Sequence, residues 1–237
     1  AYNFLPEGGK AAYIDSGTWA NKAVKEAKHL GDIAVVGSSK ATNYDRIPAA
    51  DSAPAESSYL HYTSNNTIFG TQFAGTPEVS APLIADMSSD IFSREFDANP
   101  FHLIYAGAQK NMGPAGTVMY AFDTEAAGKT GRSIPSYLDL QVHASKDSMF
   151  NTPSVFPVYV TMLTLRWIKA MGGVKAMEVR NSEKANLMYG EIDRNPLFEG
   201  HAAVGSRSTM NATFRLQDDA HATAFDAMWK EAGISGI

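Results

Sequence analysis

Five short, continuous apolar runs, each closed by small or polar residues, constrain the fold of this chain more than any other feature. They cover 33–39, 59–63, 81–86, 101–106 and 117–122. A strand with one wet face alternates apolar and polar side chains, whereas an unbroken apolar run of about four to six residues is typical of a strand buried on both faces. The sequence therefore predicts a sheet that is covered on both sides, as in α/β proteins.

Helical periodicity marks the segments around these runs. One apolar face recurs through 18–30, and Gly31 stops the pattern. An alternating pattern over 210–216 predicts a half-exposed strand. Further helical patterns cover 158–173, 174–193 and 221–233. We predict an α/β domain over 1–172, with a mostly parallel sheet and helices on both faces, and a smaller α+β domain over 173–237.

Composition and charge exclude several classes of function. The 237 residues carry a net charge of −5 without a basic run, which argues against nucleic acid as a partner. No stretch reaches the ~18 apolar residues of a membrane helix, and the N-terminus lacks a signal-peptide pattern, so we expect a cytoplasmic protein without a membrane partner. The chain has no cysteine, which rules out thiol chemistry, and its six histidines show no metal-ligand spacing.

The residues just after each apolar run are the candidates for chemistry, because open α/β sheets bind ligands outside the carboxyl ends of their strands. Most of these residues are small and polar. Two differ: Asp86 ends the run at 81–86, and Lys110 follows the run at 101–106 within "AGAQKN". If the two strands are close in the sheet, a carboxylate and an amine could face one ligand.

This pair fits the requirements of pyridoxal 5'-phosphate. A lysine in a confined pocket can lose its proton and attack a carbonyl. The cofactor also needs an acid at its pyridine nitrogen, a flat group over its ring and donors for its phosphate. Asp86 could supply the acid and Trp19 the flat group. Candidates for phosphate contacts are Thr67, Gln109 and Asn151.

Other interpretations of the same residues stay open. Asp86 could instead cap a helix or form a turn, a role that Ser88 and Ser89 could share. Lys110 could simply lie on a turn. The glycines of 105–116 resemble a phosphate-binding loop, but no Gly-Lys-Ser/Thr sequence has the required spacing, which excludes a nucleotide loop of that type.

Longer stretches resemble the phosphoserine aminotransferase family, whose members are class V, fold-type I pyridoxal-phosphate enzymes. The similarity rests first on "PLIADMSSDIFSR" followed by "FHLIYAGAQKNMGPAG". In the family's order, the other matching stretches are "YIDSGTWANKAVKEAK", "SSYLHYTSNNTIFGTQF", "HASKDSMFNTPSVFPVYV", "RNSEKANLMYGEID" and "MNATFRL". The resemblance implies a fold-type I large domain followed by part of the family's small domain.

The resemblance also implies roles for single residues. Lys110 would form the Schiff base with pyridoxal 5'-phosphate and would shuttle the proton of the substrate Cα. Asp86 would pair with the pyridinium nitrogen. Trp19 would stack on the cofactor ring, while Thr67 and Gln109 would make polar contacts to the cofactor.

A homodimer with shared active sites is implied as well. Asn151 and Thr152 of "FNTP" would reach across to the cofactor phosphate of the other subunit. The reaction implied is the transfer of an amino group from L-glutamate to 3-phosphohydroxypyruvate, which gives O-phosphoserine and 2-oxoglutarate in serine biosynthesis. Use of phosphohydroxythreonine, a substrate in vitamin B6 synthesis, as a second substrate stays open.

The resemblance stops short at both ends. We expect a truncated chain without the family's N-terminal phosphate-binding turn and C-terminal substrate arginine, and therefore weak cofactor binding and negligible turnover by this chain alone. "GHAAVGSR" imitates the C-terminal motif but lies too early, so His201 and Arg207 are not assigned to substrate. The alternatives are another class V aminotransferase, such as an alanine–glyoxylate type, and a non-catalytic fragment. A cysteine desulfurase is excluded because its nucleophile is missing.

Overall fold

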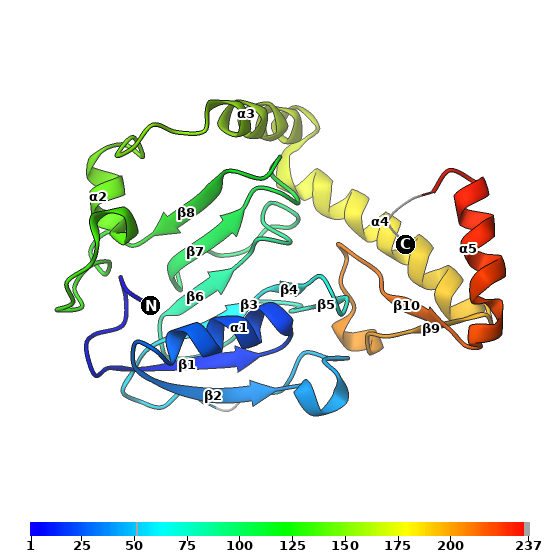
Figure 1. Cartoon of the computed structure of the whole chain (residues 1–237), viewed down its shortest axis with the longest axis horizontal. Helices are drawn as coiled ribbons and strands as arrows, with labels where there is room; N and C mark the ends of the chain where they lie inside the picture. The colour runs from blue at the N-terminus through cyan, green and yellow to red at the C-terminus, as the bar shows by residue number, and fades with distance from the viewer. Residues whose placement is uncertain (51, 235–237) are drawn as a thin grey trace.

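A six-stranded sheet forms the centre of the larger part of the molecule (Figure 1). The computed structural model describes residues 1–50 and 52–234. The strands, in their order across the sheet, are β2 (Asp32–Ser38), β1 (Lys10–Asp15), β3 (Ser57–Thr63), β6 (Leu83–Asp86), β7 (Phe101–Gly107) and β8 (Val118–Phe122). Neighbouring strands run parallel except for β7 and β8, which are antiparallel. The predicted mostly parallel sheet is therefore confirmed.

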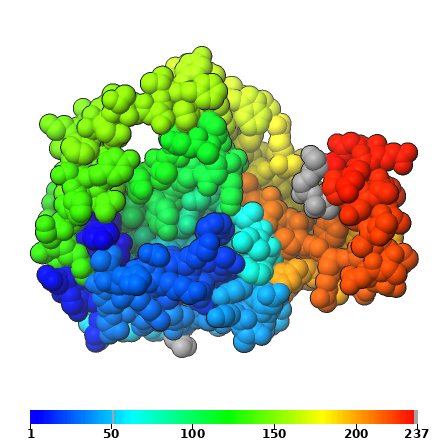
Figure 2. All heavy atoms as spheres, in the orientation of Figure 1, coloured from blue at the N-terminus to red at the C-terminus, as the bar shows by residue number. Residues whose placement is uncertain are grey.

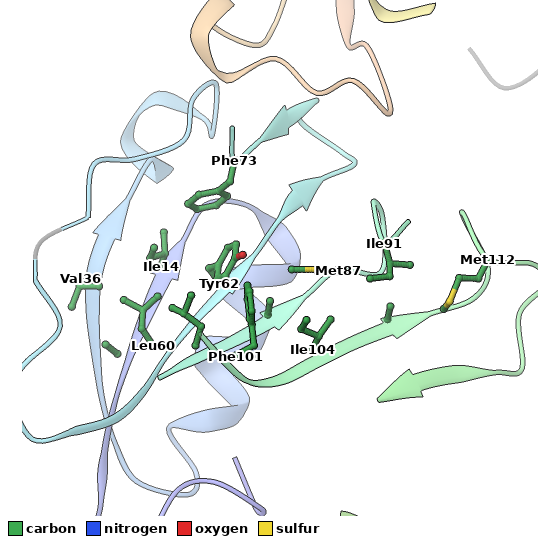
Figure 3. Packing of buried hydrophobic residues seen from close by; sticks show 14 of the residues in the cluster. Ile14, Val36, Leu60, Tyr62, Phe73, Met87, Ile91, Phe101, Ile104 and Met112 are labelled. Carbon is green, nitrogen blue, oxygen red and sulfur yellow. The ribbon is translucent and has the colours of Figure 1, made fainter. Parts of the chain in front are cut away.

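Both faces of this sheet are apolar, which is why the strand sequences read as continuous apolar runs. On β3, Leu60 and Tyr62 belong to one hydrophobic cluster, whereas Tyr59 belongs to the cluster on the opposite face. Figure 3 shows how the first cluster continues across the strands through Phe101 and Ile104. Burial of these side chains supplies most of the stabilisation that the sheet needs, at roughly 25 cal/mol per Å² of apolar area.

Helix α1 (Thr18–Ala27) packs on the second face of the sheet. Its residues Val24 and Ala27 join the same cluster as Tyr59, and the helix contacts β1, β2 and β3. The first face is covered by side chains from connecting segments, among them Phe73 and Ile91 (Figure 3). The carboxyl ends of the parallel strands lie together at one edge of the sheet, between these two covered faces.

The sequence predicted most elements but not all of them. Strand β1 was not predicted, because its first half, Lys10–Ala12, lacks large apolar side chains. The segment 210–216 is a strand only over β10 (Phe214–Leu216), which pairs with the unpredicted β9 (Phe198–Gly200). Other elements that were not predicted are α2 (Leu140–Ser145), the short strands β4 (Asn65–Asn66) and β5 (Thr71–Gln72), and the 3-10 helices η1 (Lys40–Thr42), η2 (Ser136–Leu138), η3 (Val204–Ser206) and η4 (Asp219–His221).

The long helix α4 (Gly173–Arg194) leads from the sheet to a smaller group of elements, namely β9, β10 and α5 (Ala222–Glu231) (Figure 1). The preceding helix, α3 (Val155–Ala170), lies beyond β8, the edge strand of the sheet (Figure 1). The segment 206–213 returns to the turn between β4 and β5, where Ser208 donates its backbone N–H to the carbonyl of Gly70. Across residues 1–50 and 52–234, no helix combines the length and apolar character needed to cross a bilayer.

Candidate active site

The strands that end in Asp86 and precede Lys110 are direct neighbours in the sheet. Strands β6 and β7 pair in parallel, and Asp86 lies opposite Tyr105 on one side and Thr63 on the other. Lys110 follows three residues after the end of β7. The condition on which the predicted pairing of carboxylate and amine depended is therefore met.

The amine of Lys110 contacts two hydroxyl groups. Its Nζ donates a hydrogen bond to Oγ of Ser89 at 2.7 Å and another to Oγ1 of Thr67. The two hydroxyl oxygens lie 2.7 Å from each other. The side chain of Lys110 as a whole is exposed, whereas Ser89 is buried. The protein therefore fixes only the amine end of this lysine. The rest of its side chain is more exposed than the confined pocket predicted from the sequence would allow.

The pKa of Lys110 lies below its ordinary value. Partial desolvation of the amine is the main cause, because it disfavours the charged form. The carboxylates of Asp86 and Asp90 act in the opposite direction and stabilise the ammonium ion. A larger fraction of Lys110 is consequently neutral, and able to act as a nucleophile or base, than of an ordinary surface lysine.

The Asp86 carboxylate is held by the turn that follows it. Its Oδ1 accepts a hydrogen bond from the backbone N–H of Ser88 at 2.9 Å, and Oγ of Ser88 accepts one from the N–H of Gly107 at 3.1 Å. The turn interpretation of Asp86 is thus correct as local structure. It does not compete with a cofactor role, because the turn fixes the carboxylate at the strand end beside the loop of Lys110.

Tyr105, a half-buried neighbour of Asp86 in the sheet, links this region to the buried His61. Burial raises the pKa of the Tyr105 hydroxyl, and the neighbouring Asp86 carboxylate raises it further. The same hydroxyl lies 2.9 Å from Nε2 of His61. Burial lowers the pKa of His61 to about 3, so its imidazole is neutral. Sequence reasoning placed the histidines at the surface or in the core, and His61 belongs to the core.

Thr67 is anchored by a segment far away in the sequence. The side-chain amide of Asn211 donates to the backbone carbonyl of Thr67 at 2.6 Å, and its Oδ1 accepts from Nδ2 of Asn65 at 3.0 Å. Sequence reasoning missed Asn211, since nothing local in "MNATFRL" signals a partner 144 residues earlier. It counted Ser89 among the informative polar residues at the end of the run 81–86, but gave it only a capping role.

Trp19 and Gln109 lie at the carboxyl ends of β1 and β7. Trp19 occupies the first turn of α1 and is 49% exposed, with Nζ of Lys22 at 4.5 Å from its ring centroid. The Gln109 side chain folds over Gly107, so an added Cβ at position 107 would have to displace only the flexible end of Gln109. Neither side chain is hydrogen-bonded to Lys110 in the described chain.

The structure does not bring Asn151 and Thr152 to the other predicted residues. Both are exposed on the connection between α2 and α3, which runs along the outer side of β8 (Figure 1). The side chain of Asn151 donates to the backbone carbonyl of Thr152 at 3.2 Å. Their predicted role concerned the other subunit of a dimer, so this position within one chain leaves that role a prediction.

Two of the predicted side chains, those of Lys110 and Trp19, are exposed within one chain. Two hollows of about 140 and 240 Å³ lie elsewhere, both lined by Arg94 and Glu178, and neither includes a predicted site residue. Arg207 contacts the second hollow but forms hydrogen bonds of 2.6 and 2.7 Å to Asp193, which supports a structural role. No cluster of three or more His, Asp or Glu suited to a metal occurs in the part of the chain that the structure describes.

The residues present fit the chemistry of pyridoxal phosphate. A partly desolvated amine, a carboxylate fixed by its own turn and a half-exposed indole all lie along the carboxyl edge of the same sheet. These three side chains do not pack against one another, so they remain available to a ligand. This edge can therefore accept a flat, anionic carbonyl compound whose ring nitrogen carries a proton.

Comparisons with known proteins agree with the motifs. The family model described as aminotransferase class-V matches residues 1–235. A phosphoserine aminotransferase of Flavobacterium johnsoniae is 59% identical over 236 residues, which is 100% of this chain and 66% of that relative. A solved phosphoserine aminotransferase from Bacillus circulans subsp. alkalophilus has a TM-score of 0.93 at 41% identity, over 99% of this chain and 66% of that one. A phosphoserine aminotransferase from Trichomonas vaginalis with bound PLP has a TM-score of 0.90 at 30% identity, over 98% and 68%.

Proposed function

The chain belongs to the class-V aminotransferase family, and we propose that its protein is a phosphoserine aminotransferase that uses pyridoxal 5'-phosphate. The single observation that carries this proposal is the placement of Lys110 beside the strand of Asp86, in a chain 59% identical to a relative of that name. The chain spans 66% of that relative's length, so the activity is proposed for the protein as a whole.

Each residue along the carboxyl edge would have a distinct task. The amine of Lys110 would bind the aldehyde carbon of the cofactor and, once free, carry the α-proton of the substrate on Nζ. Asp86 would keep a proton on the ring nitrogen, and Trp19 would stack on the ring. Thr67 and Gln109 would contact the cofactor through their polar groups. Bound pyridoxal phosphate supplies an electron sink, which none of these side chains provides.

We also propose a homodimer in which the second copy covers 140–170, the arch made by α2, α3 and their connection. Phe156 on this arch is 71% exposed, and a single chain rarely leaves so many large apolar side chains in water. The other exposed apolar residues of the arch are Met149, Phe150, Val155, Val158, Tyr159, Leu163 and Trp167. Figure 2 shows an opening between this yellow-green arch and the green body of the sheet.

The position of Asn151 and Thr152 supports a second copy as the occupant. Both residues lie on the arch, exposed and without contact to Lys110. If a second copy binds to the arch, the strand ends of that copy would lie next to Asn151 and Thr152 of the first copy. At those strand ends an anionic phosphate needs donors. The exposed side chain of Lys110 would be covered by the same contact.

Amino transfer from L-glutamate to 3-phosphohydroxypyruvate tests the proposed function. The whole protein, rather than this chain alone, is expected to form O-phosphoserine and 2-oxoglutarate, and Lys110→Ala is expected to lose this activity. The matched control is Lys25→Ala, which removes an exposed lysine near the end of α1 and should leave the activity unchanged. Transfer between alanine and glyoxylate, with none to the phosphorylated acid, would instead support the alternative type of class V enzyme.

A further inference from the structure

Three polar atoms form a closed triangle at the end of Lys110. Nζ of Lys110 donates to Oγ1 of Thr67 and to Oγ of Ser89, and the two hydroxyl oxygens are hydrogen-bonded to each other at 2.7 Å. Ser89 is only 9% exposed, so water competes little for its hydroxyl. Every side of the triangle is therefore a hydrogen bond within the protein.

The corners of this triangle are fixed by other contacts. Ser89 follows a turn that is bound to Asp86 through the N–H of Ser88 and to β7 through the N–H of Gly107. The backbone of Thr67 is held by the amide of Asn211. The hydroxyl groups consequently stay in place while the longer and exposed Lys110 side chain can move.

Such a triangle satisfies the amine in both of its protonation states. An ammonium ion donates to both oxygens, and one hydroxyl donates to the other. A neutral amine donates to one oxygen and accepts from the second hydroxyl, while the two hydroxyls remain bonded. A change of protonation therefore requires the rotation of a hydroxyl hydrogen but no movement of a heavy atom.

We propose that Ser89 is a further catalytic residue, which holds Nζ of Lys110 in place while this amine takes up and releases the substrate's α-proton. The inference rests on the proposed transaminase function. When the substrate's Cα–H bond breaks, the proton joins the lone pair of Nζ, and the bonding electrons stay with the substrate carbon. The hydroxyl hydrogen that pointed at Nζ turns away at the same time, so no further reactant is needed.

Loss of the Ser89 hydroxyl should shift the titration of Lys110 in a predictable direction. The charged groups near this amine are Asp86 and Asp90, and both are unchanged in Ser89→Ala. A hydrogen bond to an ammonium ion is stronger than one to a neutral amine, so removal of the acceptor destabilises the charged form more. The pKa of Lys110 should therefore fall further below its ordinary value.

The test is the pH dependence of Lys110 labelling by a small acylating reagent in the cofactor-free protein, followed by mass spectrometry of the labelled peptide. Ser89→Ala should label with a lower apparent pKa than wild type. Ser93→Ala is the matched control, since Ser93 is buried nearby and its hydroxyl has no partner among residues 1–50 and 52–234. If Ser89→Ala does not fold, Thr67→Val removes the other hydroxyl without changing side-chain shape and should show the same direction of shift.

A kinetic measurement separates this inference from the proposed function. With glutamate, Ser89→Ala should transfer the amino group about ten- to a hundredfold more slowly, while the fraction of cofactor bound to Lys110 stays unchanged. Normal wild-type transfer combined with an unaltered Lys110 titration in Ser89→Ala would overturn the role of Ser89 alone. Absence of transfer by the whole wild-type protein would overturn the proposed function, and with it any catalytic role for Ser89.

Discussion

Mixed dimers of two inactive variants should recover activity if the active sites are shared. Lys110→Ala removes the amine from one side of a site, and Asn151→Ala removes a donor that the structure places on the exposed arch, away from Lys110 in the same chain. A mixed dimer contains one site with both wild-type residues and one site with neither. After equal mixing and random exchange, about half of the dimers are mixed, so about a quarter of the wild-type activity should return.

The assay is amino transfer after dissociation and re-association of the two purified variants. Lys110→Ala mixed with Asp86→Asn is the control pairing, because both residues belong to the same chain's strand ends and no mixed dimer can restore a site. This control should stay inactive. If the first pairing also stays inactive although the subunits have exchanged, Asn151 does not act across the interface and the shared-site proposal is refuted.

Three further predictions concern stability and assembly. The pKa of His61 is about 3 in the folded protein and near 6.5 in the unfolded chain. The contribution of His61 to the free energy of unfolding should therefore be complete above pH 6.5 and should be lost as the pH falls towards 3, at about 1.4 kcal/mol per pKa unit. His61→Phe should remove this loss in urea titrations. Burial raises the pKa of Asp90 in the folded protein. The contribution of Asp90 to folding stability is therefore complete below pH 3.8 and is lost as the pH rises through the folded pKa. Asp90→Asn should be more stable than wild type at pH 7, and a lower denaturation midpoint for this variant would contradict the prediction. Phe156→Asp should weaken dimerisation about tenfold or more in sedimentation experiments without lowering the monomer's unfolding midpoint, whereas unchanged dimerisation would place the interface elsewhere.

The sheet could be predicted because burial on both faces leaves a local signature. Runs such as 101–106 need no knowledge of their neighbours to be recognised as strands. Strand β1 was not predicted, because Lys10, Ala11 and Ala12 at its start lack large apolar side chains. Both alanines are nevertheless fully buried. Ala11 packs in the cluster that includes α1 and Ala12 packs in the cluster on the opposite face, and such packing cannot be read locally.

The pair of Asp86 and Lys110 could also be predicted, since both residues follow apolar runs and parallel strands end at one edge. The supporting contacts could not. Asn211 reaches Thr67 across 144 residues, and Ser89 gains its partner Nζ only when β6 and β7 lie side by side. Hydrogen bonds of this kind depend on tertiary geometry, for which a single sequence holds no periodic signal.

Several predictions stay untested. The division between residues 172 and 173 is one of them, although α4 does carry the chain from the sheet to β9, β10 and α5 (Figure 1). The homodimer and the roles of the site residues are others, and those of Asn151 and Thr152 are the least accessible to sequence reasoning. They depend on a second copy of the chain, and no property of an isolated strand or helix could reveal that partner.

Reductive trapping tests the central claim most directly, namely that Lys110 is the amine that binds the cofactor. The protein is incubated with pyridoxal phosphate, treated with borohydride to make the bond between amine and cofactor permanent, digested and analysed by mass spectrometry. The prediction is one modified peptide that contains "AGAQKN", with the added mass on Lys110, and no modification at this site in Lys110→Ala. Stoichiometric modification of a different lysine, with Lys110 unmodified, would contradict the assignment.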